Sequence, residues 1–172
     1  PRDELVRWMV GRELTGQFPP RSVRPGDPRL SLRDFSVRHP GGTRRWAVQE
    51  VSFTVKSGEI LGIAGLQGSG NSDLLMGLFG AFGSDVSGEV TLGGKTFSVV
   101  SPARSIRQGM ALLTNDRKET GLILDMSVCR NITLAAVSHF VRCEVMNVRK
   151  EQAVAEKHRA ALGIRAHSLD QP

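Results

Sequence analysis

Several features are scarce or missing in this chain of 172 residues, and each absence excludes a class of protein. No apolar run approaches the roughly 20 residues that cross a bilayer, so a membrane span is not expected. The opening PRDELVRWMV carries charges where a signal peptide has its apolar stretch. Cys129 and Cys143 have no metal-like spacing, which excludes a disulfide scaffold and a Cys-rich zinc site and makes a reducing, cytosolic setting the default.

Aromatic residues are also scarce, at 5% of the chain, although the formal net charge is +6. A basic chain suits a polyanionic partner such as nucleic acid, an acidic membrane surface or phosphates. However, few aromatics and no tyrosine leave little to stack on bases, and the arginines are spread along the chain. We therefore expect a solvated basic surface and no nucleic-acid partner. A basic module whose DNA or RNA binding depends steeply on salt remains the alternative.

Proline and glycine divide the chain into a linker and one folded domain. Residues 1–28 are predicted to be a linker, with a short helix over 4–10 followed by an extended, proline-rich stretch. From residue 29 to residue 172, strand and helix patterns alternate, which predicts an α/β domain. Because the chain starts at Pro1 rather than Met, we expect a piece of a longer protein.

Hydrophobic periodicity predicts the elements of this domain. Period-two alternation predicts strands over 30–37 and 46–55. Short apolar runs without alternation predict two strands buried on both faces, over 59–65 and 110–114. The other expected elements are a turn over 39–43, a helix over 72–80, a hairpin over 87–97 that turns at Gly93-Gly94, a helix over 101–109 with Ser101 as N-cap, helical structure over 127–139, and an exposed helix over 147–162 with Val154, Ala155, His158, Ala161 and Leu162 facing inward.

A glycine-rich loop between the predicted strand over 59–65 and the predicted helix over 72–80 is the strongest chemical signal. It reads Gly65-Leu66-Gln67-Gly68-Ser69-Gly70-Asn71-Ser72 and matches the phosphate-binding P-loop G-x-x-x-x-G-K-[ST] at every fixed position but one. Glycines let consecutive N–H groups point into one concavity, and the following helix adds its own unsatisfied N–H groups. The pattern predicts an anion site for a di- or triphosphate, with the Ser72 hydroxyl as a ligand of Mg²⁺.

The one departure is Asn71, which stands where the motif has lysine. An amide can donate a hydrogen bond to a phosphate but carries no charge. The missing charge matters more for hydrolysis than for binding, because charge shifts in the transition state. We expect nucleotide binding with weak or absent turnover, and the bland alternative is a tightly packed strand-to-helix turn that binds nothing.

Three stretches together resemble a known family. VSFTVKSGEILGIAGLQGSGNS, SGEVTLGGKTF and SPARSIRQGMALLTNDRKETGLILDMSVCRNITL resemble the ATP-binding subunit of ABC importers. NDRKETGL and the opening MVGRELTGQFP are similar to the second ATPase half, and its preceding connector, in the double-length subunits that drive ribose, xylose, galactose or arabinose uptake. The resemblance implies a P-loop NTPase core with an antiparallel β subdomain and the start of a helical subdomain, incomplete over residues 29–172.

The resemblance also implies which residues bind ATP and Mg²⁺. Asn115 falls where the family has the Q-loop glutamine, so Asn115 and Ser72 would hold the metal, although asparagine is a departure there. The adenine-stacking aromatic should lie near His39; His39 itself, or Trp46, is a weak candidate. The nucleotide-binding residues implied are Gly65, Leu66, Gln67, Gly68, Ser69, Gly70, Asn71, Ser72, Asp73 and His39.

Partners and missing parts follow from the same resemblance. The implied partners are transmembrane permease subunits, the first ATPase half of the same chain and, indirectly, a periplasmic sugar-binding protein. The permease subunits would face the segment from Asn115 to His139. The implied location is the cytoplasmic face of the inner membrane. The family's signature loop, Walker B aspartate, catalytic glutamate and switch histidine do not occur in this sequence. We expect no catalytic residue here, no activity from this piece alone, and apolar strands left without their neighbours. A nucleic-acid-associated ATPase of the same type and a non-binding structural half remain alternatives.

Overall fold

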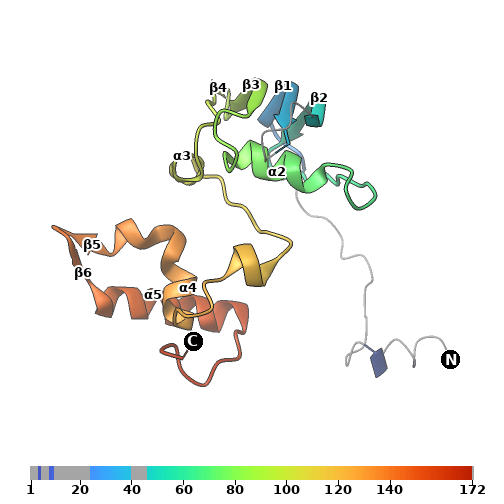
Figure 1. Cartoon of the computed structure of the whole chain (residues 1–172). Coiled ribbons are helices and arrows are strands. Elements are labelled where there is room, and N and C mark those ends of the chain that lie inside the picture. Colours follow the sequence, from blue (N-terminus) through green and yellow to red (C-terminus); the bar gives the residue numbers. More distant parts are fainter. Residues whose placement is uncertain (1–3, 5–7, 10–23, 40–45, 172) are drawn as a thin grey trace.

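The computed structural model describes residues 4, 8–9, 24–39 and 46–171 of the chain (Figure 1). It shows two lobes: a sheet lobe, residues 24–39 and 46–109, and a helical lobe, residues 122–171, joined by a connecting segment, residues 110–121. The linker helix expected over 4–10 and the turn expected over 39–43 lie mostly outside the described residues. Every helix in the described part of the chain is too short or too polar to cross a membrane.

The sheet lobe is built on an antiparallel sheet with the strand order β2-β1-β3-β4. β1 (Pro28–Arg38) is flanked by β2 (Trp46–Lys56) and β3 (Val86–Leu92), and the short β4 (Lys95–Thr96) follows β3 at the edge. These strands confirm the two alternating strands and the hairpin that the sequence predicts.

One core lies between this sheet and α2 (Asn71–Phe79), which runs along one face of the sheet (Figure 1). Apolar side chains alternate toward that face in the strands and recur at helical spacing in α2, so they meet in one layer. The buried members of the core are Leu32, Phe35, Val37, Val48, Leu74, Leu78, Val90 and Phe97. The predicted helix over 72–80 is thereby confirmed.

α3 (Pro102–Arg107) is attached to the end of α2 by a buried hydroxyl. Ser101 caps α3, as the sequence predicts, by accepting a hydrogen bond from the backbone N–H of Arg104 at 3.4 Å. Ser105 is fully buried and donates to the carbonyl oxygen of Phe79 at 2.8 Å. This contact fixes where the chain leaves the sheet lobe.

The prediction of two strands buried on both faces is wrong for this structure. Residues 59–65 and 110–114 form no strand, and they pair with no strand among the described residues. Several of their apolar side chains are exposed, with Ile60 at 86% and Leu113 at 95% relative exposure, whereas Met110 is half-buried against the core. The physical reason is that a strand buried on both faces needs a neighbour on each side and a covering layer, which local sequence does not supply.

The helical lobe pairs two helices, as the patterns over 127–139 and 147–162 predict. α4 (Val128–Thr133) packs against α5 (Val148–Leu162), and the 3₁₀ helix η2 (Leu134–His139) continues α4. A two-stranded hairpin, β5 (Val141–Arg142) and β6 (Val145–Met146), links η2 to α5. Figure 1 shows this lobe below the sheet lobe, with the C-terminus next to α4.

The predicted inward face of α5 is only partly correct. Ala155 is fully buried and Val154 is half-buried, whereas His158, Ala161 and Leu162 are exposed. Glu151 is buried instead, at 6% relative exposure, because its carboxylate accepts a hydrogen bond from a buried hydroxyl of α4. Hydrophobic periodicity assigns every glutamate to the exposed face of a helix, so it could not predict that Glu151 is buried.

Candidate phosphate-binding site

The glycine-rich loop forms a tight turn immediately before α2. The N–H of Ser69 donates to the carbonyl oxygen of Leu66 at 3.0 Å, which closes the turn. Gly68 and Gly70 have φ angles of +81° and +88°, a left-handed conformation that favours glycine. A Cβ on Gly70 would lie 2.5 Å from the carbonyl oxygen of Ala47 at the start of β2. The loop is therefore packed directly on the sheet at this glycine.

The loop leaves backbone donors available at the start of α2. Gly70 occupies the N-cap position and provides no side-chain cap. Within the described part of the chain, no group accepts a hydrogen bond from the N–H of Gly68 or Gly70. The first N–H groups of a helix also lack intrahelical partners, and they lie at the positive end of the helix dipole. Such an arrangement binds anions, and phosphates in particular.

Two polar side chains lie over the first glycine of the loop. A Cβ placed on Gly65 would clash with the Ser69 hydroxyl and would lie 2.9 Å from Nδ2 of Asn71. A side chain on residue 65 would therefore displace Ser69 and Asn71, and Asn71 is turned toward the loop. The amide that replaces the expected lysine is thus a neutral donor beside the free N–H groups.

Ser72 and Asn115, far apart in the sequence, are in contact. Nδ2 of Asn115 donates to Oγ of Ser72 at 2.9 Å. Both residues line a small cleft of about 200 Å³ between α2 and residues 112–120. The structure thus brings together the two residues that the sequence analysis names as metal ligands.

Asp116, which follows Asn115 and was not predicted from the sequence, caps the next turn of the chain. Oδ1 of Asp116 accepts hydrogen bonds from the N–H groups of Lys118 and Glu119, at 2.8 and 3.0 Å. This contact begins η1 (Arg117–Gly121), a single π-helical turn. The signal was available, because aspartate before a short turn is a common cap for backbone N–H groups.

The oxygens at this contact are compatible with Mg²⁺. Mg²⁺ prefers oxygen ligands, and in P-loop proteins the hydroxyl after the loop supplies one while phosphates and waters supply others. The Ser72 hydroxyl is at that place. Asn115 currently presents its amide nitrogen, so a half-turn of the amide would be needed for its oxygen to face Ser72. No carboxylate or histidine cluster suited to a metal occurs in the described residues.

The candidates for stacking on a base lie at the sheet end where the loop packs. His39 directly follows β1, whose last residue, Arg38, pairs with Trp46 at the start of β2. His39 is exposed. Trp46 is half-buried, and the Arg38 guanidinium lies 4.8 Å from the centre of its ring. One face of Trp46 is therefore already occupied by Arg38.

Comparison with known proteins shows the family to which this chain is related. The family model described as "ABC transporter" matches residues 48–170. The chain is 40% identical over 136 residues, 79% of its length, to the xylose import ATP-binding protein of Moorella thermoacetica. It is 36% identical over 170 residues, 99% of its length, to the ribose import ATP-binding protein of Geobacillus kaustophilus. These alignments cover 27% and 33% of the two relatives, so the chain spans about a third of their length.

A solved structure is similar in fold. It is the dimeric, post-hydrolysis state of the ATP-binding cassette MJ0796 bound to ADP and Pi, with a TM-score of 0.61. The match covers 83% of this chain and 60% of that chain, at 17% sequence identity. The ATP-binding cassette fold predicted from sequence is thereby confirmed, including its antiparallel sheet and the helices of the second lobe.

Proposed function

This chain belongs to the ABC transporter family, and we propose that it is part of the ATP-binding component of a monosaccharide importer. The observation that carries the proposal is the uncapped start of α2, where the N–H groups of Gly68 and Gly70 are free and Ser72 contacts Asn115. The names of the relatives support a monosaccharide, because they are described as import proteins for xylose, for ribose, or for ribose, galactose and methyl galactoside.

In this proposal the chain's own groups hold ATP by its phosphates. The loop from Gly65 to Ser72 donates backbone N–H groups, Asn71 adds an uncharged amide donor, and His39 lies at the sheet end for the base. Asp73, in the first turn of α2, completes the set implied by the family. Mg²⁺, when bound, would neutralise phosphate charge, with Ser72 and Asn115 as its protein ligands.

Asn71 makes this a site for binding rather than turnover. A hydrogen bond to a charged group contributes about 1.5–3 kcal/mol even when the donor is neutral, so the phosphates can still be held. The lost ammonium would act mainly on charge that develops during hydrolysis. ATP binding here would therefore change the position of a partner subunit without being consumed at the same rate as at a lysine-containing site.

The partners proposed are permease subunits in the membrane, the first ATPase half, and indirectly a periplasmic sugar-binding protein. The chain would lie at the cytoplasmic face of the membrane, with the segment from Asn115 to His139 toward the permease. Support comes from the family and from the import proteins among its relatives.

Titration with a fluorescent ATP analogue, with Mg²⁺ and with EDTA, tests the proposal. We expect saturable binding by this chain that Gly70→Val abolishes and that Gly94→Ala, a matched change in the distant β3–β4 turn, leaves intact. Mg²⁺ should strengthen binding several-fold. Absence of saturable binding in both buffers would rule out the nucleotide site.

A second function is favoured by one observation: Ser69 and Asn71 fold over Gly65. If these side chains fill the loop, the chain would be a structural half that supports an active partner and binds nothing. Asn71→Lys separates the two. A lysine restored to a working cradle should raise affinity about tenfold or more, since it adds a charged hydrogen bond. A filled loop should show no binding before or after the substitution.

A further inference from the structure

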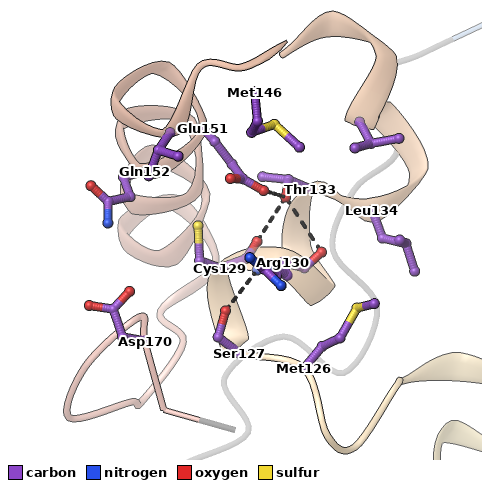
Figure 2. Close-up of a pocket in the computed structure, with 12 residues that line it drawn as sticks. Met126, Ser127, Cys129, Arg130, Thr133, Leu134, Met146, Glu151, Gln152 and Asp170 are labelled. Carbon is purple, nitrogen blue, oxygen red and sulfur yellow. Dashed lines mark hydrogen bonds between the residues drawn. The ribbon is translucent and has the colours of Figure 1, made fainter. Parts of the chain in front are cut away.

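A larger cavity lies in the helical lobe, away from the glycine-rich loop. It has a volume of about 460 Å³ and opens between α4, η2 and α5 (Figure 2). Much of its wall is apolar, formed by Met126, Leu134, Val137, Met146 and Val148. Its size and lining are those of a site for a small organic group, since such sites measure roughly 300–1,000 Å³ and combine apolar walls with a few polar groups.

One carboxylate in this wall is hydrogen-bonded through only one of its two oxygens. Glu151 is 6% exposed, and its Oε1 accepts a hydrogen bond from Oγ1 of Thr133 at 2.8 Å. In the described part of the chain, no group donates to the other oxygen, Oε2, and no Lys or Arg nitrogen is within ion-pairing distance. Because no buried side-chain oxygen among the described residues lacks a partner, Oε2 is open to solvent, where a ligand in the cavity can reach it.

The cavity is acidic, although the chain as a whole carries a net charge of +6. Glu151 and Asp170 oppose a single basic residue, Arg130. The buried thiol of Cys129 responds to this field: burial raises its pKa, Glu151 and Asp170 raise it further, and Arg130 lowers it. Negative potential therefore reaches the inner part of the cavity, where Cys129 lies between α4 and α5 (Figure 2).

We infer that this cavity binds an organic cation: a guanidinium or ammonium group on a short apolar stem. The cationic group would donate to Oε2 of Glu151, and the stem would lie along Met126 and Met146. Thr133 holds the carboxylate in place, because its buried hydroxyl lies 2.8 Å from Oε1 and donates its single proton there. The cation has two sources, a free small molecule or an arginine or lysine side chain. This site is independent of the proposed nucleotide site.

The test uses n-butylguanidinium as the probe and the full chain labelled on its methionine methyl groups. We expect saturable NMR shifts of the Met126 and Met146 methyls, and none with n-pentanol, which has the stem but no charge. Glu151→Gln keeps an acceptor for Thr133 and removes the charge, so it should weaken binding about tenfold or more. Glu156→Gln, an exposed acid on the same helix, is the matched control and should bind as the parent does.

A second variant guards against misfolding of Glu151→Gln. Met146→Trp fills the cavity from β6 without touching the charge, and it should abolish the shift of Met126. A short peptide with a single arginine distinguishes the sources: tighter binding than the free probe indicates a partner's side chain, and weaker binding indicates a free ligand. Equal binding of pentanol and butylguanidinium, no saturation by either, or unchanged affinity in folded Glu151→Gln would overturn the inference.

Discussion

Two kinds of apolar segment occur in this molecule, and only one of them is folded into a sheet. In β1, Phe35 and Val37 are 1% and 0% exposed. In the segments over 59–65 and 110–114, which are as apolar, Ile60 and Leu113 are 86% and 95% exposed. The difference lies in partners: β1 has a hydrogen-bonded strand on each side, and the two segments have none among the described residues. An apolar segment can form a strand, but it does so only where neighbouring strands hydrogen-bond to its backbone.

The paired region satisfies its backbone even where the ladder is irregular. β1 and β2 have non-glycine residues with left-handed φ angles at Asp34 and Glu50. Their N–H groups donate to the hydroxyls of Ser52 and Ser36, at 2.8 and 2.9 Å. The glycine-rich loop lies at the boundary between the unpaired and the paired region, because it follows an unpaired segment and precedes a helix packed on the sheet. Its shape therefore depends on the paired side.

The largest expected difference between the regions comes from truncating one apolar side chain in each. Phe35→Ala should lower the free energy of unfolding by about 3–5 kcal/mol, because it opens a cavity in the packed core. Ile60→Ala should change it by less than about 0.5 kcal/mol, because nothing in the described structure packs on that side chain. Urea denaturation followed by circular dichroism measures both. An equal loss in the two variants would show that residues 59–65 are packed in solution, and the contrast between the regions would fail.

The next effect compares a glycine within the glycine-rich loop and a glycine in the unpaired segment before it. Gly70→Val should cost about 1–3 kcal/mol, because its φ is +88° and an added Cβ would meet the Ala47 carbonyl oxygen. Gly62→Ala should be neutral, because nothing lies within 4 Å of an added Cβ and its φ is ordinary. The same denaturation experiment applies. A neutral Gly70→Val would mean that the loop is not seated on β2.

Sequence alone predicted what local pattern determines. The alternating strands, the Gly93-Gly94 hairpin and the Ser101 cap each follow from a few adjacent residues, and each is confirmed. Pairing of the segments over 59–65 and 110–114 is not local, so their periodicity could not decide it. Contacts between distant polar groups were missed for the same reason: Glu151 with Thr133, and the Asn131 amide, which donates to the Ile123 carbonyl oxygen at 3.0 Å.

The site divides along the same line. The glycines and Ser72 were recognised from spacing, and the structure shows left-handed φ angles and free N–H groups at Gly68 and Gly70. Asn115 was placed near Ser72 by family resemblance alone, since no pattern joins two residues so far apart in the chain. Neither spacing nor resemblance predicted the hydrogen bonds that Asp116 accepts from Lys118 and Glu119; only the structure shows them.

A smaller effect is expected at the join between α2 and α3. Ser105→Ala should cost about 1 kcal/mol, because a buried hydroxyl no longer donates to the Phe79 carbonyl oxygen. Ser98→Ala, a substitution at an exposed residue before α3, should leave the free energy of unfolding unchanged. Urea denaturation measures both variants. If Ser105→Ala does not change stability, the hydrogen bond to Phe79 does not hold α3 on the sheet lobe. α3 would then belong with the loosely packed segments of the molecule.

The smallest global effect is expected at Asp116, which lies in the connecting segment. Asp116→Ala removes an acceptor from two N–H groups, a cap worth about 0.5 kcal/mol at an exposed place. Because this segment has few packed neighbours, it should open locally, so global unfolding should hardly change while the amides of Lys118 and Glu119 exchange several-fold faster with deuterium. Nucleotide affinity should fall too, because Asn115 then loses its fixed position beside Ser72. Faster exchange in β1 as well would show that the connecting segment and the sheet unfold as one unit, which would remove the boundary between paired and unpaired regions.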